Sequence, residues 1–206
     1  LITESANEKY FDASVQMQRK SKNSYFVSDT LSQKISETKN SQGVFAVCKM
    51  KNENISLKTG QKYIALDNIQ DPGNLGTVIR TAEALGISSV IVGGGCDVFN
   101  PKVLRASMGS VLRLDVFECQ SLAPVLQKAK SLGIKTYATS PDSSAKKINE
   151  TQFPKSSLCV IGNEANGVSD EVMNICDETV TIPMLGRAES LNAHVAGAIV
   201  MWEMLR

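Results

Sequence analysis

The chain has 206 residues and a formal net charge of only +1 at neutral pH. Hydrophobic residues make up 42% of it and charged residues 21%, a composition typical of a globular protein with a sizeable core, which excludes disordered and fibrous chains. No apolar run approaches the roughly 20 residues that cross a bilayer, and the first residues lack the basic and apolar regions of a signal peptide. We therefore expect a cytoplasmic protein with no membrane partner.

The first part of the chain predicts little regular structure. Residues 29–36 have the pattern of a short capped helix, and residues 44–48 that of one strand. Residues 1–50 contain too few apolar positions for an independent core, so we expect them to be the remaining part of a larger domain. A polar stretch follows, and it predicts a linker over residues 51–61.

Charge differs between the two parts of the chain. Residues 1–62 hold ten Lys and Arg against six Asp and Glu, whereas residues 63–206 hold twelve against fifteen. The first part is the better candidate for contact with a polyanion. Its basic cluster could meet phosphates, although so short a cluster also fits a solvated surface; its members are Lys9, Arg19, Lys20 and Lys22.

Apolar strand-like runs alternate with helical patterns after residue 62. The expected strands are residues 64–66, 90–92, 112–117, 136–138, 158–161 and 180–182. The expected helices are residues 75–85, 101–108, 122–132, 171–175 and 192–205. This alternation predicts one α/β domain over residues 62–206, with a parallel sheet and helices on both faces.

Three of the expected strands lead into turns that are rich in Asn, Gly and Ser. These segments are residues 67–80, 158–169 and 181–192. Because ligands of parallel α/β sheets bind outside the carboxyl ends of the strands, we expect the three turns to build one composite site.

Each segment also has a purely structural interpretation. In the first, Asn74 is a good helix N-cap, and Arg80 could be an exposed arginine paired with a neighbouring carboxylate. In the third, Ser190 and Asn192 could cap the final helix and do nothing more. The glycine run at residues 93–95 lacks the G-x-G-x-x-G spacing of a dinucleotide fingerprint, so we interpret it as a flexible strand exit.

In order, spacing and content, the three segments resemble the signature motifs of the SpoU-type (TrmH-like) RNA 2′-O-ribose methyltransferases of the SPOUT superfamily. The resemblance covers the chain from Tyr63 onward. It implies a C-terminal trefoil knot, a rare exception to the rule that chains are unknotted. It also implies that residues 1–50 are the C-terminal part of a small α/β RNA substrate-binding domain, and that the protein is a homodimer.

The reaction implied by the resemblance is transfer of a methyl group from S-adenosylmethionine to a ribose 2′-OH in structured rRNA or tRNA, without a metal. The positions that match the family's cofactor-binding residues are Thr139, Gly162, Asn163, Gly167, Ile182, Met184 and Leu191. The positions that match its catalytic residues are Asn74, Arg80, Glu164, Ser190 and Asn192.

We expect Arg80 to clamp a phosphate with two hydrogen bonds, because a guanidinium with a pKa above about 12 is a poor base. By resemblance, Glu164 orients this arginine. The hydroxyl proton would leave through Ser190, Asn192 or water, and the sequence does not separate these routes.

Two positions depart from the family pattern. Ala165 stands where the family often has glycine, and His194 where it more often has serine. We interpret His194 as a capping or packing residue of the final helix rather than a general base. That helix is apolar on nearly every side, which indicates that a second subunit covers part of it.

Two other classes of protein fit the chain less well than a methyltransferase. A catalytically silent RNA-binding protein on the same scaffold would need no complete set of motif residues. A nicotinamide-dependent oxidoreductase would need the glycine fingerprint, which is missing. The five cysteines lie far apart, so we expect small buried side chains in a reducing compartment rather than disulfides or metal ligands; they are Cys48, Cys96, Cys119, Cys159 and Cys176.

Overall fold

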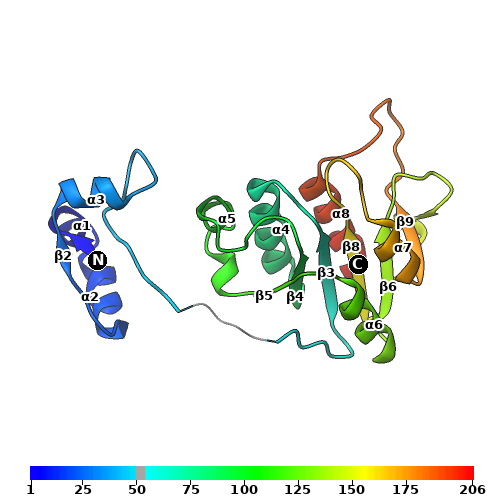
Figure 1. Ribbon diagram of the computed structural model, residues 1–206, viewed down its shortest axis with the longest axis horizontal. Coiled ribbons are helices and arrows are strands. Elements are labelled where there is room, and N and C mark those ends of the chain that lie inside the picture. Colours follow the sequence, from blue (N-terminus) through cyan, green and yellow to red (C-terminus); the bar gives the residue numbers. More distant parts are fainter. Residues whose placement is uncertain (50–53) are drawn as a thin grey trace. The chain divides into compact units, whose positions relative to one another are not determined.

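A computed structural model describes residues 1–49 and 54–206, and the chain divides into two compact units, Leu1–Asn52 and Glu53–Arg206 (Figure 1). Within the described residues, no helix has the length and apolar character needed to span a bilayer. All five cysteines are free; Cys159 is buried, Cys48 is exposed and the other three are half-buried. The expectation of buried cysteines is therefore correct for Cys159, partly correct for three others and wrong for Cys48.

The first unit combines short helices with a small parallel sheet. Strands β1 and β2 pair in parallel, and the helices are α1, α2 and α3. Their bounds are β1 Ile2–Thr3, α1 Glu4–Lys9, α2 Phe11–Lys20, β2 Phe26–Val27 and α3 Asp29–Ile35. The Ser28 hydroxyl accepts a hydrogen bond from the Leu31 amide and starts α3, so the predicted capped helix is confirmed.

Two features of this unit differ from the prediction. The strand expected over residues 44–48 is wrong: only Val44 forms a bridge, antiparallel to Ile2, and Val47 is 96% exposed. Helices α1 and α2 were not expected, because each buries only a small residue, Ala6 or Ser14, and so lacks a visible apolar period.

The second unit is built on a seven-stranded, all-parallel sheet with the order β5-β4-β3-β8-β6-β9-β7. The strands are β3 Lys62–Asp67, β4 Ser89–Gly93, β5 Asp115–Cys119, β6 Lys135–Thr139, β7 Lys146–Lys147, β8 Ser157–Ile161 and β9 Glu178–Thr181. Strands β3, β8, β6 and β9 are neighbours in this order, so their carboxyl ends lie along one edge of the sheet.

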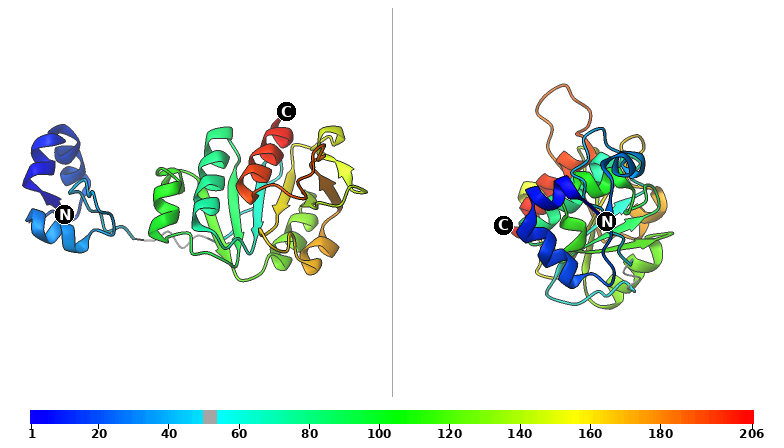
Figure 2. Two further views of the ribbon diagram at one scale, coloured as in Figure 1. Left: turned by 90° about the horizontal axis from the view of Figure 1, so that it is seen from above. Right: turned by 90° about the vertical axis from the view of Figure 1, so that its left-hand side faces the viewer.

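Helices cover both faces of this sheet (Figure 2). The helices are α4 Pro72–Leu85, α5 Pro101–Ala106, α6 Ala123–Ser131, α7 Asp170–Ile175 and α8 Ala193–Leu205, with 3-10 turns at Ser110–Leu112 and Ile148–Glu150. Residues of β3 alternate between two cores: Ile64 and Leu66 pack with α4 and α8, whereas Tyr63 and Ala65 pack with α6. The predicted parallel α/β sheet with helices on both faces is confirmed.

The differences in this unit lie at its edges. The strand expected at residues 112–117 begins only at Asp115, because Leu112 ends a 3-10 turn and is 72% exposed. Strand β7 consists of two exposed lysines at the sheet edge, where charged residues are common and no apolar alternation exists. Of the predicted linker, residues 51–53 lie outside the described residues, whereas Leu57 is only 7% exposed and packs into the core beside α6.

Candidate functional site

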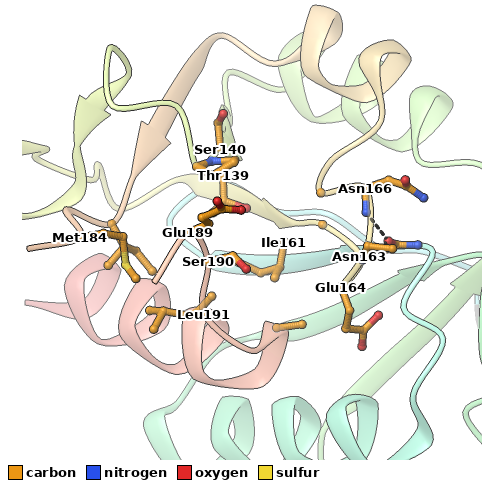
Figure 3. A pocket seen from close by; sticks show the side chains of 17 residues that line it. Thr139, Ser140, Ile161, Asn163, Glu164, Asn166, Met184, Glu189, Ser190 and Leu191 are labelled. Atoms are coloured by element: carbon orange, nitrogen blue, oxygen red, sulfur yellow. Dashed lines mark hydrogen bonds between the residues drawn. The ribbon is translucent and has the colours of Figure 1, made fainter. Parts of the chain in front are cut away.

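A cavity of about 270 Å³ lies at the carboxyl ends of β6, β8 and β9 (Figure 3). Every residue expected to bind the cofactor lines it: Thr139, Gly162, Asn163, Gly167, Ile182, Met184 and Leu191. Glu164 and Ser190 line it as well, whereas Asn74, Arg80 and Asn192 do not. The structure therefore brings two of the three motif segments together around one cavity.

The loop after β8, residues 162–169, is closed by its own hydrogen bonds. The backbones of Asn163 and Gly167 exchange two bonds of 3.0 Å. The Asn163 Oδ1 atom accepts two more, from the amides of Ala165 at 2.8 Å and Asn166 at 2.9 Å. Gly167 has a φ of +70°, which favours glycine, while Ala165 is not among the residues with positive φ. Alanine at position 165 therefore fits this loop without backbone strain.

Gly162 is required by the loop itself. A Cβ atom at this position would overlap the backbone of Gly167 and Val168. The sequence predicted that glycine here lets a ligand approach the backbone. The structure gives a different reason, which is that the loop folds back against its own first residue.

The turn after β3 leads into α4, and the residue that caps this helix is not the predicted Asn74. The Asp71 carboxylate accepts a hydrogen bond from the Asn74 amide at 2.8 Å, so Asp71 is the N-cap of α4 and Asn74 lies inside the helix. The Asn74 side chain is therefore available for other contacts. Its Nδ2 donates to Glu164 Oε1 at 2.6 Å, and its Oδ1 lies 2.9 Å from His194 Nδ1.

This arrangement changes the expected partner of Glu164. Its carboxylate bonds Asn74, and the expected contact with Arg80 is not formed. Arg80 is exposed and makes no hydrogen bond or ion pair within the described parts of the chain. The nearby carboxylate of Glu83 pairs with Arg113 at 2.9 Å instead, and this hydrogen bond lowers the pKa of Glu83. The alternative of a surface ion pair between Arg80 and Glu83 is therefore wrong.

Two further links join the first and second segments. The Asp67 carboxylate accepts a hydrogen bond from the Ser169 amide at 2.8 Å. The Asn163 Nδ2 donates to the carbonyl of Asn68 at 3.3 Å, and Asn68 holds a positive φ of 56°. Sequence reasoning missed Asp67, Asn68 and His194 as parts of the site. The position of Asp67 and Asn68 directly at the end of β3 was the signal that could have found the first two.

The loop after β9 is open by comparison. Asn192 Oδ1 accepts a hydrogen bond from the His194 amide at 2.9 Å and caps α8, while Ser190 is exposed and does not cap it. Leu185 is fully exposed. Among the described residues, the side chains from position 183 to 191 make no hydrogen bond with protein. The same described residues contain no cluster of three or more His, Cys, Asp or Glu side chains that could hold a metal ion.

The fold and cavity together define an α/β domain that binds a small ligand at the carboxyl ends of its parallel strands. Residues 61–202 match the model of the SpoU rRNA Methylase family, so the chain belongs to that family. Its relatives include the 23S rRNA (guanosine(2553)-2'-O)-methyltransferase RlmP of Bacillus subtilis, 36% identical over 87% of this chain and 71% of the relative. Another is the 23S rRNA (uridine(2479)-2'-O)-methyltransferase of Streptomyces viridochromogenes, 34% identical over 69% of this chain and 52% of the relative.

Solved structures agree with this assignment. The rRNA methyltransferase of Sinorhizobium meliloti superimposes with a TM-score of 0.80 at 28% identity, over 87% of this chain and 70% of that chain. The SpoU methyltransferase AviRb of Streptomyces viridochromogenes, solved in complex with AdoMet, superimposes with a TM-score of 0.66 at 33% identity, over 72% of this chain and 61% of that chain. The chain thus spans between about half and seven-tenths of the length of these relatives.

Proposed function

We propose that this protein transfers the methyl group of S-adenosylmethionine to a ribose 2′-OH in rRNA or tRNA. The observation that carries the proposal is that all seven residues matched to the family's cofactor site line one cavity, beside the bonded pair Asn74 and Glu164. The AdoMet complex of AviRb and the 2′-O-methyltransferase activity named for the Bacillus relative support it.

The chemistry of the cavity fits the cofactor. Ile161, Ile182 and Leu191 provide apolar walls for an adenine ring, and the Glu189 carboxylate can accept hydrogen bonds from a ribose or an ammonium group. The bound cofactor supplies a sulfonium methyl group. The loops after β6, β8 and β9 would hold the cofactor, and positioning two reactants in one site can contribute roughly 7–11 kcal/mol.

The exposed Arg80 has no protein partner within the described residues, so its guanidinium is available to bind RNA. Its planar guanidinium can bond a phosphate at two oxygens and so fix the target nucleotide. Asn74 holds Glu164 at the edge of the cavity, and Ser190 and Asn192 face the RNA from the third loop.

We further propose that residues 1–49 contact RNA. This unit carries the basic side chains Arg19 and Lys20, and its aromatic side chains Tyr25 and Phe26 are each 60% exposed, as base stacking requires. Reversing both charges, Arg19→Glu with Lys20→Glu, should weaken RNA binding and flatten its salt dependence. Unchanged affinity over a salt series would exclude this surface.

We propose a homodimer that buries one side of α8. Val195, Trp202 and Leu205 lie seven and three residues apart, on one face of the helix, and are 38%, 61% and 37% exposed. Light scattering at micromolar concentration should give twice the mass of the chain, and Trp202→Asp should give the monomer. A monomeric mass for the parent would contradict the dimer.

We further propose that the C-terminal segment forms a knot and that the protein acts in the cytoplasm.

Calorimetry tests the proposed function against its two alternatives. We expect S-adenosylmethionine to bind and NADH not to bind. A silent RNA-binding protein would bind RNA without methylating it. An oxidoreductase would bind NADH, and that result would overturn the proposal.

A further inference from the structure

The protein contains a single histidine, and that histidine closes a chain of hydrogen bonds across the site. Glu164 from the loop after β8 bonds Asn74 of α4 at 2.6 Å. Asn74 in turn lies 2.9 Å from Nδ1 of His194, on the first turn of α8. Asn74 and Glu164 come from the first two motif segments and His194 lies two residues after the third, and the chain of bonds does not follow from helix capping or core packing.

The order of the chain fixes which nitrogen of the ring carries a proton. The ionised Glu164 only accepts hydrogen bonds, so it holds the Asn74 amide with Nδ2 toward itself and Oδ1 toward the ring. An oxygen facing Nδ1 requires a proton on Nδ1. In the neutral ring, Nε2 then carries the free lone pair. Carboxylates and amides fix imidazole bases in this way in other enzymes.

The Nε2 atom is free of protein partners among the described residues, and His194 follows Ala193, which lines the cavity. This nitrogen makes no hydrogen bond with any described residue and is not among the buried unpaired side-chain atoms. The other residues that match the family's catalytic positions offer fewer free acceptor atoms. The Asn192 oxygen is used in capping α8, the Oε1 atom of Glu164 is bonded by Asn74, and the guanidinium of Arg80 has no lone pair to offer.

We propose that His194 is a catalytic residue that accepts the proton of the ribose 2′-OH through Nε2, and this rests on the proposed function. The bond between the 2′ oxygen and the methyl carbon forms while the bond between that carbon and the sulfonium sulfur breaks, and its electron pair stays on sulfur. The proton moves to Nε2, and the resulting imidazolium later releases it to water. Asn74 and Glu164 are positioning residues for this step, because they hold the ring in the competent tautomer.

Nitrogen NMR tests the tautomer without any turnover. Because the chain has one histidine, ¹⁵N-histidine labelling of the full chain gives signals from this ring alone. In the neutral ring, we expect Nδ1 to carry the proton and Nε2 to show the shift of an unprotonated nitrogen. The opposite tautomer, or the fast mixture of tautomers that a free imidazole shows, would overturn the proposal.

Two substitutions separate proton transfer from structure. His194→Asn keeps an amide nitrogen able to donate to Asn74 but removes the Nε2 lone pair. His194→Ala removes both groups and leaves space for added imidazole. We expect both to lower kcat by at least about 100-fold with unchanged affinity for S-adenosylmethionine and RNA, and imidazole to restore part of the activity of His194→Ala. Glu203→Gln, at the far end of the same helix, should keep the parent rate.

The outcomes are distinguishable. A parent that methylates no RNA contradicts the proposed function itself. A parent that methylates RNA while His194→Asn keeps full kcat contradicts only the role of His194, whose contact with Asn74 would then be structural. If a variant fails to fold by circular dichroism, the tautomer of the parent decides.

Discussion

Two of the loops that line the cavity, those after β8 and β9, are built in opposite ways. The loop after β8 is closed by backbone bonds between Asn163 and Gly167 and is tied to the β3 turn by Ser169, Asn163 and Glu164. The loop after β9 projects Leu185 fully into solvent, and its side chains make no hydrogen bond among the described residues before the Asn192 cap.

The two loops should therefore differ in how much conformational entropy they lose when a ligand binds. A loop held by its own hydrogen bonds presents its groups without an entropy cost at binding, whereas an open loop must be ordered by the ligand. Changes in the first loop should therefore alter the free protein. Changes in the second should alter only binding and catalysis.

Two glycine substitutions give the largest expected contrast. Gly162→Ala places a methyl group on the backbone of Gly167, so the first loop cannot close. We expect the affinity for S-adenosylmethionine to fall by more than about 100-fold and stability to fall by several kcal/mol. In the second loop, a Cβ at Gly186 meets nothing within 4 Å. Gly186→Ala should stay within about 0.5 kcal/mol of the parent. Calorimetry and thermal unfolding measure both, and equal effects at the two sites would refute the contrast.

Arg80 extends the comparison to the RNA side of the site. Because it has no partner in the described residues, Arg80→Ala should leave stability and cofactor affinity nearly unchanged while abolishing methylation. Arg80→Lys should also be poor, because lysine keeps the charge but loses the planar fork. Arg113→Lys is the matched control, because Arg113 forms an ion pair with Glu83. We expect this variant to methylate RNA at the parent rate. Near-normal rates for Arg80→Lys would argue for simple charge.

Asn163 and Ser190 test the loops with smaller changes. Asn163→Ala removes the acceptor of two backbone amides, so it should cost about 1–3 kcal/mol of stability. Ser190→Ala removes a hydroxyl that has no hydrogen-bond partner among residues 1–49 and 54–206, so unfolding should be unchanged while methylation slows. Urea titrations of both variants check this. A destabilised Ser190→Ala would show that the second loop is ordered before ligand binds.

Asp177 provides a control far from both loops, where β6 begins. Burial raises the pKa of its carboxyl, but hydrogen bonds from Thr136 and the ion pair with Lys130 outweigh burial and hold the pKa below its usual range. The stabilisation is present above the unfolded pKa of about 3.9 and is lost as pH falls through the folded value. Asp177→Asn should lower stability by about 1 kcal/mol at neutral pH and weaken its acid dependence, with cofactor affinity unchanged. A loss of cofactor affinity would contradict the separation of this end from the site.

Elements that are deeply buried were the ones that the sequence predicted. Strands β3, β4 and β8 consist largely of residues that are buried on both faces, and their apolar runs made them visible. Helices α1 and α2, which bury only Ala6 and Ser14, left no such pattern. The run at residues 44–48 looked like a strand because local pattern does not show whether a partner strand exists.

For the site, resemblance identified the lining residues but not their connections. The motif positions were enough to collect Thr139, Ile182 and Leu191 around one cavity. The contact of Asn74 with both Glu164 and His194 joins residues 90 and 120 positions apart, and it depends on how α4 and α8 pack. No spacing in the sequence encodes such a contact, so His194 was interpreted as a capping or packing residue.

Methylation of ribose in RNA by this chain can be measured directly. The most direct measurement incubates the protein with S-adenosylmethionine and unmodified rRNA or tRNA, digests the RNA and quantifies 2′-O-methylnucleosides by mass spectrometry. We expect one 2′-O-methylnucleoside to accumulate with the parent protein and not with Arg80→Ala. A methyl group found on a base, or no methylation of either RNA by a protein that binds S-adenosylmethionine, would contradict this expectation.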